Sequence, residues 1–152
     1  MKLEGFFDIE IFRDGKLAER IHLKNLLTTV SQTARVQQLL GTYNGGSDAL
    51  EIKYFAFGDD TTPPAVSDVT LGNELFRKQI TTITASGGNV QSIVNLGSAE
   101  ANFTIREIGV FCGPLATATA NSGTLLARVA VNIPKNSNIT MNIVRTDVCT
   151  LN

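Results

Sequence analysis

The sequence predicts a mainly β protein, an antiparallel β-sandwich or flattened barrel with one short helix and an N-terminal β-hairpin. Three observations lead to this prediction. Several short runs alternate apolar and polar residues, turn signals separate these runs, and a single segment follows the period of a helix. At 152 residues, of which 43% are hydrophobic, the chain is long enough to bury a core as a single compact domain.

The first predicted element is a hairpin within residues 1–24, ahead of a β-sandwich domain at 25–152. Gly5 to Phe12 alternates in polarity, and Leu17 to Leu23 alternates again. Between them, Arg13-Asp14-Gly15-Lys16 carries a central Asp-Gly pair, which favours a two-residue turn.

This hairpin is also predicted to be a docking arm. Phe7, Ile9 and Ile11 lie on one face of its first strand, and Phe6 and Phe12 lie on the opposite face. A lone hairpin of this size is marginally stable in water, so it needs either the core of this domain or a neighbouring protein. We take Phe6 and Phe12 as the docking face, and expect a chain without residues 1–24 to fold but to fail in assembly.

The one helix is predicted at about residues 29–40. Val30, Ala34 and the Gln-Gln-Leu-Leu run that ends at Leu40 fit a helical period better than a strand. A Thr or Ser within 28–31 can cap its start, and Gly41 supplies the usual stop.

The remaining elements are predicted strands. Ser86-Gly87-Gly88-Asn89 signals a second hairpin. Leu125, Ala127, Val129, Val131 and Ile133 are expected to share one face of the last but one strand. The predicted strands are Ile52 to Gly58, Glu74 to Thr84, Val90 to Leu96, a strand within 101–111, Thr124 to Ile133, and a last strand from Ile139 onward.

The segment 101–111, ANFTIREIGVF, changes the parity of its apolar residues. Phe103 and Ile105 alternate regularly, but Ile108 and Val110 then occupy the other parity. A β-bulge shifts side-chain parity in this way, and a glycine makes the distortion cheap. We therefore predict a bulge at residues 107–109, with Gly109 in a backbone conformation that a Cβ would strain.

Charge and hydropathy argue against two classes of partner. The net charge of −1 and the pI of about 5.8 leave no basic excess to neutralise phosphates, so no nucleic-acid partner is expected. Glu4, Asp8 and Glu10 interrupt any leader-like apolar core, and no run approaches the roughly 20 apolar residues of a membrane span. The chain is expected to be soluble and made in a cytoplasm, with no membrane partner.

No motif of catalysis or metal binding is recognisable. His22, the only histidine, is expected on the polar face of the hairpin, and Cys112 and Cys149 are expected to be buried thiols rather than a disulfide. Asp59-Asp60 lacks the spacing of a calcium loop and is expected to be a solvated turn. No catalytic residue, metal or cofactor is therefore predicted, and the chain is not expected to be an enzyme.

Two segments carry a family resemblance. The run IKYFAFGDDTTPPAVSDVTLGNELFRKQI is similar to a pattern in virion proteins of tailed bacteriophages. In that pattern a strand ends in a glycine-acidic turn, a proline loop follows, and "T-x-L-x-x-E-x-x-R" comes next. Thr70-Leu71, Glu74 and Arg77 match this last element with one residue fewer after the threonine.

The second segment, ANFTIREIGVF, resembles the strand ending "I-x-E-[IV]-G-[LV]-F" of the same family. The order of elements is similar over roughly residues 25 to 148 and includes LLARVAVNIPKNSNITMNIVRTDV. The N-terminal hairpin has no place in the family pattern, and a long fibre shaft is missing.

The resemblance implies a structural component of the virion, assembled in the host cytoplasm, whose partners are other virion proteins and copies of itself. Its location is expected in the tail, baseplate or tail fibre. One alternative is a capsid decoration protein, and an alternative of another class is a carbohydrate-binding domain for a host-surface glycan. The motif residues Glu74, Arg77, Arg106, Glu107 and Gly109 are interpreted as structural: the charges form pairs that support the fold and fix the register of the sheet.

Overall fold

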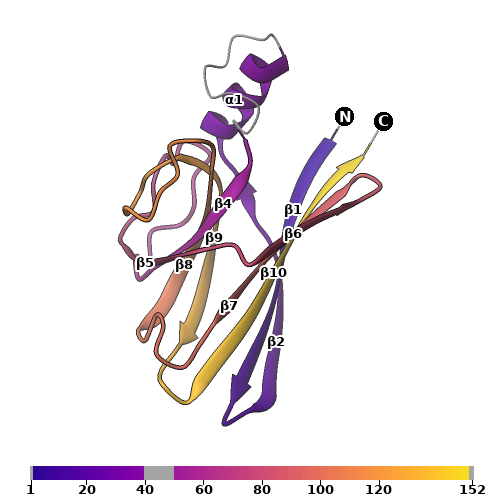
Figure 1. The fold of residues 1–152 in the computed structure, drawn as a ribbon. Helices are drawn as coiled ribbons and strands as arrows, with labels where there is room; N and C mark the ends of the chain where they lie inside the picture. The colour runs from indigo at the N-terminus through magenta and orange to yellow at the C-terminus, as the bar shows by residue number, and fades with distance from the viewer. Residues whose placement is uncertain (1, 40–49, 151–152) are drawn as a thin grey trace.

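Two antiparallel sheets of five strands each enclose a core of apolar side chains, which confirms the predicted β-sandwich (Figure 1). The computed structural model describes residues 2–39 and 50–150. Sheet A has the strand order β2 (Lys16–Lys24), β1 (Lys2–Arg13), β10 (Ile139–Thr150), β7 (Asn89–Leu96) and β6 (Thr82–Ser86). Sheet B has the order β3 (Leu26–Leu27), β9 (Thr124–Pro134), β8 (Thr104–Cys112), β4 (Ile52–Gly58) and β5 (Glu74–Gln79).

The main core lies between the inner faces of these two sheets. β1 and β10 contribute the buried side chains of sheet A, and β4, β8 and β9 contribute most of those of sheet B. Phe7 of β1 meets Phe55 of β4 edge to face, with ring centroids 5.8 Å apart, which joins the centres of the two sheets.

The N-terminal hairpin forms as predicted. Asp14 and Gly15 both have positive φ angles, 48° and 78°, which is the signature of the two-residue turn that suits a twisted hairpin. The closing pair is Arg13 with Lys16.

The hairpin is built into the sandwich, and its role as a docking arm stays a prediction. β1 is an inner strand of sheet A and pairs along its whole length with β10, from Lys2 opposite Thr150 to Arg13 opposite Ile139. Phe7, Ile9 and Ile11 are fully buried members of the main core. The sequence could not reveal this, because the partner strand β10 lies at the other end of the chain.

The predicted helix is present as α1 (Thr29–Leu39), at the end of the sandwich where both termini lie (Figure 1). Thr28 caps it: its Oγ1 accepts a hydrogen bond from the Ser31 N–H at 3.3 Å. The Thr28 hydroxyl also donates to the Leu125 carbonyl of β9, which ties the start of the helix to sheet B. The last predicted helical residue, Leu40, and the predicted stop at Gly41 lie outside the described residues.

The strand predicted from Glu74 to Thr84 is two strands in different sheets. Ile80 N–H donates to the Lys53 carbonyl of β4, whereas Thr81 N–H donates to the Ile93 carbonyl of β7. The chain thus crosses from sheet B to sheet A between these two residues. No glycine or proline marks the crossing, so the sequence pattern reads as one continuous strand.

The parity switch in β8 is real, but the predicted bulge is misplaced. The register shifts between Ile105 and Glu107, where Arg106 alone faces two residues of β9. Residues 107–109 then pair one for one with both β9 and β4, and Gly109 does not have a positive φ. Ile105 and Ile108 both reach the main core across this shift.

Candidate functional site

The outer face of sheet B is covered by two loops, residues 59–73 and 113–123. A second, smaller apolar cluster lies between this face and the loops; its buried members are Ala56, Leu71, Phe111, Ala116 and Leu125. Side chains of β8 alternate between the inner and the outer face of sheet B. Because the loops cover the outer face, all residues from Glu107 to Cys112 are buried. This arrangement explains why polar motif residues of β8 and β5 are buried.

Glu107 is the centre of the first buried ion network. Its carboxylate accepts Arg128 Nε at 2.9 Å and the backbone N–H groups of Gly72 and Asn73 at 3.0 and 2.8 Å. The side chains of Glu107 and Arg128 are only 1% and 4% exposed. Both oxygens of the carboxylate are thus used to hold the 59–73 loop against sheet B.

Arg128 extends this network to the start of the same loop. Its Nη1 donates to Asp68 at 2.8 Å, and its Nη2 reaches Asp60 at 3.3 Å and the Thr62 carbonyl at 3.0 Å. Burial alone would lower the pKa of Arg128, but its hydrogen bond to Asp68 and the charge of Glu107 outweigh it, so the pKa is raised. The guanidinium therefore stays charged and fixes three separate points of the loop.

Asp68 makes this network sensitive to acid. Burial works against its ionised form, but the Ala65 N–H and Arg128 stabilise the carboxylate more strongly, so its pKa lies below the ordinary value. The unfolded chain then binds more protons than the folded one as pH falls through the unfolded pKa of about 3.9. The stabilisation by Asp68 is complete above that pKa and is lost as pH falls through the lower folded value.

We expect the free energy of unfolding to fall more steeply between about pH 5 and pH 3 in the native chain than in Asp68→Asn. Urea denaturation at several pH values measures this difference. Equal slopes for the two proteins would show that Asp68 is not linked to folding, and Asp59→Asn serves as a control carboxylate outside the Arg128 contacts.

Glu74 and Arg77 form the second buried network, which holds the other loop. Arg77 Nε and Nη2 bond the Glu74 carboxylate at 2.5 and 2.8 Å. Arg77 Nη1 donates to the Thr117 carbonyl at 2.9 Å and to the Ser122 hydroxyl at 3.1 Å. Its guanidinium also lies over the Phe111 ring, 4.5 Å from the centroid.

The structure brings four of the five predicted motif residues to the outer side of sheet B, three of them in the two ion networks and Gly109 against the outer apolar cluster. The polar groups of Glu74, Arg77 and Glu107 form hydrogen bonds with loop backbone and with neighbouring side chains. In the part of the chain that is described, Arg106 belongs to neither network, and it stands half-buried at the register shift. We therefore interpret both networks as clamps on loops rather than as a ligand site.

Gly109, the fifth motif residue, is constrained by packing instead of by its backbone angle. A Cβ built on it would lie 2.7 Å from Leu71 Cδ2 and 3.1 Å from Leu125 Cδ1. Gly109→Val is expected to lower the free energy of unfolding by about 1–3 kcal/mol through overpacking.

Denaturant unfolding of Gly109→Val alone and combined with Leu71→Ala tests this cause. The second substitution should recover part of the loss, because it removes the methyl groups that the new side chain meets. Purely additive losses would instead point to the backbone of β8.

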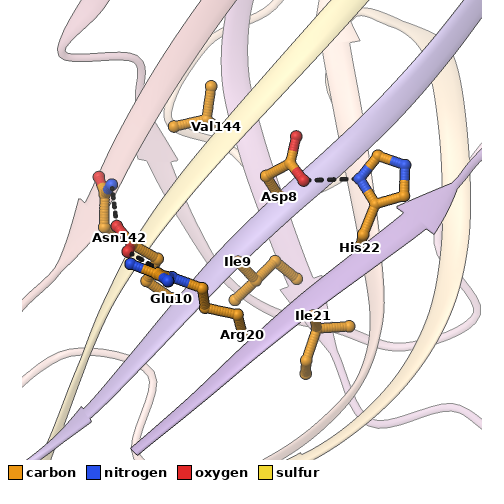
Figure 2. A pocket seen from close by; sticks show the side chains of 8 residues that line it. All are labelled: Asp8, Ile9, Glu10, Arg20, Ile21, His22, Asn142 and Val144. Atoms are coloured by element: carbon orange, nitrogen blue, oxygen red, sulfur yellow. Dashed lines mark hydrogen bonds and ion pairs between the residues drawn. The ribbon is translucent and has the colours of Figure 1, made fainter. Parts of the chain in front are cut away.

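The outer face of sheet A differs from that of sheet B, because its middle holds a groove of about 390 Å³. Figure 2 shows Asp8 beside His22 and Glu10 between Arg20 and Asn142 in this groove. His22 Nδ1 lies 2.6 Å from Asp8 Oδ1, and Glu10 contacts Arg20 at 3.2 Å and Asn142 at 3.3 Å. His22 is on the exposed polar face, as predicted.

The predicted docking residues Phe6 and Phe12 flank this groove on the same face but are half-buried. The Phe6 ring stacks on His22 with centroids 5.6 Å apart, and Lys24 Nζ lies 5.9 Å from its centroid. Phe12 lines a second, more open depression of about 400 Å³ with Lys78 and Glu100. Both rings are half-buried and lie beside charged or polar side chains, so the face is mixed in polarity rather than an apolar patch.

One ion pair inside the main core was not anticipated. Arg145 is fully buried, bonds Asp147 on the same strand through Nε at 2.9 Å and Nη2 at 2.6 Å, and lies over the Phe7 ring. Arg145 and Asp147 are two residues apart, a spacing that places both side chains on one face of a strand, so this pair has a local signal in the sequence that the predictions above do not use.

The two cysteines are free thiols, and neither is bonded to the other. Cys112 is buried as predicted, and burial raises its pKa to about 12, so its reactive thiolate form is suppressed. Cys149 is only half-buried, which corrects the prediction for that residue.

Among the described residues, no group of three or more His, Cys, Asp or Glu side chains is arranged to hold a metal ion. Over the same residues, no helix has the length and hydropathy needed to cross a membrane.

Comparisons with known proteins identified no relative of this chain. No protein-family model, no curated protein and no solved structure matches the chain.

Proposed function

We propose that this chain is a structural component of a bacteriophage virion, associated with the tail or tail fibre, that acts through protein–protein contacts in a symmetric assembly. The proposal starts from the sequence resemblance of the two segments that contain Glu74, Arg77 and Glu107. The observation that carries it furthest is what these residues do: they clamp two surface loops over one sheet with buried charges.

Such clamps suit an assembly subunit. A surface loop normally moves, and ordering it on binding costs conformational entropy. Loops already held by buried ion pairs present a fixed surface, so a partner does not have to order them. Burying the charges costs desolvation energy, and we infer that the networks are present because they fix one conformation of the surface loops.

The experiment is to purify particles of the phage that encodes the chain and to measure the chain by quantitative mass spectrometry across a density gradient. Antibody–gold labelling of the same particles, with antibody pre-absorbed on the purified chain as control, then locates it. A constant copy number per particle and labelling on the tail support the proposal. Labelling over the head supports the alternative of a capsid decoration protein, and absence from particles overturns both.

A host-glycan site is the alternative of another class, and the groove on sheet A is the observation that favours it. Asp8, Glu10, Arg20 and Asn142 converge there beside the Phe6 ring, as polar groups do in a sugar site. These side chains already bond one another, so a sugar would have to replace those bonds. Titration with cell-surface polysaccharide, compared between the native chain and Glu10→Ala, decides this alternative.

We also propose that the chain has no hydrolytic or transfer activity. The Asp8–His22 pair is an acid–base arrangement, but the side chains that line its groove include no Ser, Thr or Cys that could act as nucleophile. Turnover of polysaccharide or peptidoglycan that a single Asp or Glu substitution abolishes would contradict this.

A further inference from the structure

The outer strand of sheet A at its β6 edge has an unusual composition. The whole stretch 79–99, which includes β6 and β7, contains no charged residue, although 18% of the chain is charged. All five residues of β6 are exposed, and Ile83 has 43% of its surface accessible. Threonine and isoleucine are residues that favour strands.

The backbone of β6 is available on one side. β6 is the last strand in the order of sheet A, and its only strand partner there is β7. The pair that closes its two-residue turn, Ser86 with Asn89, is a hydrogen-bonded pair. Because such pairs alternate along an antiparallel ladder, Ile83 and Ala85 direct their N–H and C=O groups away from β7.

The other edges of the two sheets carry features that prevent pairing with a second chain. β2, at the opposite edge of sheet A, contains Lys16, Glu19, Arg20 and Lys24, and its register with β1 shifts at Ala18. β3 has only two residues, and β5 contains Glu74, Arg77 and Lys78. Charges, bulges and short length are the means by which proteins protect sheet edges. β6 has five residues, no charged residue and no bulge against β7.

We propose that β6 pairs antiparallel with β6 of a second copy of this chain, about a two-fold axis at Thr84, so that two sheets A join into one continuous sheet. In a two-fold contact each side chain meets groups of the same surface, so a charged edge would repel itself. The uncharged stretch 79–99 avoids that repulsion, which favours a second copy over a partner selected by charge.

The register follows from the backbone. Centring on Thr84 pairs Ile83 with Ala85 of the partner, joins the two sets of outward N–H and C=O groups, and covers the exposed Ile83 side chain. The projecting β6–β7 hairpin stands at the end of the sandwich beside both termini, where a second hairpin has access (Figure 1). The contact is one strand wide and is strengthened when other contacts hold the copies together.

This inference deepens the proposed function and rests on it for the expectation that many copies meet in one assembly. The first test is sedimentation equilibrium of the purified full chain over a concentration series. We expect a monomer–dimer equilibrium that Ile83→Lys weakens by at least about tenfold, because two lysines are then brought together at the axis. Leu17→Lys on the β2 edge is the matched control, with 42% exposure of the native side chain, and it should leave the equilibrium unchanged.

The second test fixes the register. In a Cys149→Ser background, Thr84→Cys should form an interchain disulfide on mild oxidation, since residues opposite each other in a ladder have a Cα separation that a disulfide spans. Ala18→Cys on the β2 edge should not. Ala85→Pro, which removes only an outward N–H, should also reduce dimer formation.

A chain that stays monomeric at all concentrations, or a dimer that Ile83→Lys and Ala85→Pro leave intact, overturns the inference. These results are separate from the particle experiment above: a chain found in virions but indifferent to β6 substitutions refutes the edge contact alone, whereas a chain absent from virions refutes the proposed function alone.

Discussion

A chain without residues 1–24 is expected to have no cooperative folded state, because the deletion removes β1 from the middle of sheet A. The lost strand contributes Phe7, Ile9 and Ile11 to the core and the whole pairing of β10 on one side. Truncating one such buried side chain costs about 2–5 kcal/mol. The loss of all three side chains and of the β1–β10 hydrogen bonds is therefore comparable to the whole free energy of unfolding of a domain, roughly 5–15 kcal/mol.

Circular dichroism and urea denaturation of the truncated chain measure this effect. Two point variants of the full chain act as a matched pair on the same strand: Ile9→Ala, on the core face, should cost about 2–5 kcal/mol, and Phe6→Ala, on the half-exposed face, clearly less. A truncated chain that still unfolds cooperatively would restore the hairpin as a separable arm.

Glu107→Gln is expected to lower the free energy of unfolding by about 3–5 kcal/mol, because it removes one partner of a buried ion pair. Arg128 then remains 4% exposed with only the peripheral carboxylates Asp60 and Asp68, and one of the two loop N–H groups loses its acceptor. Loss of the charge, not of volume, is the cause, since glutamine has almost the same size.

Asp60→Asn is the control for this prediction: the Asp60 side chain is 29% exposed, so its pair with Arg128 should contribute at most about 1 kcal/mol. A double-mutant cycle with Arg128→Met isolates the Glu107–Arg128 coupling. If Glu107→Gln costs no more than Asp60→Asn, or if its cost is unchanged in the Arg128→Met background, the clamp is not held by this pair.

The sequence predicted those elements whose determinants are local. The Asp14-Gly15 turn and the Thr28 cap each depend on residues within a few positions. The errors arose where a distant strand decides. Leu125 was expected on the core face of β9, but a register shift against β8 turns it to the outer cluster and brings Leu126 inward.

The candidate site was predictable in kind but not in its pairs. Glu74 and Arg77 are three residues apart, which puts them on opposite faces of a regular strand, and the register shift opposite Phe57 and Gly58 lets them bond. The sequence does not indicate which arginine Glu107 contacts, and only the pairing of β8 with β9 places Arg128 beside it. The role of both networks depends on loops whose path over sheet B no local pattern indicates.

The pairing of β1 with β10 sets the order in which this protein can fold. Lys2 and Thr150 are opposite each other, so two neighbouring inner strands of sheet A are far apart in the sequence. During synthesis β1 leaves the ribosome long before β10, and β2 is its available neighbour in sheet A until β10 follows. Sheet A is therefore completed only after β10 has emerged, and such a high contact order is typical of folding in milliseconds to seconds. Until then the apolar face of β1 stays open, which makes slow synthesis between β2 and β10 a hazard for aggregation.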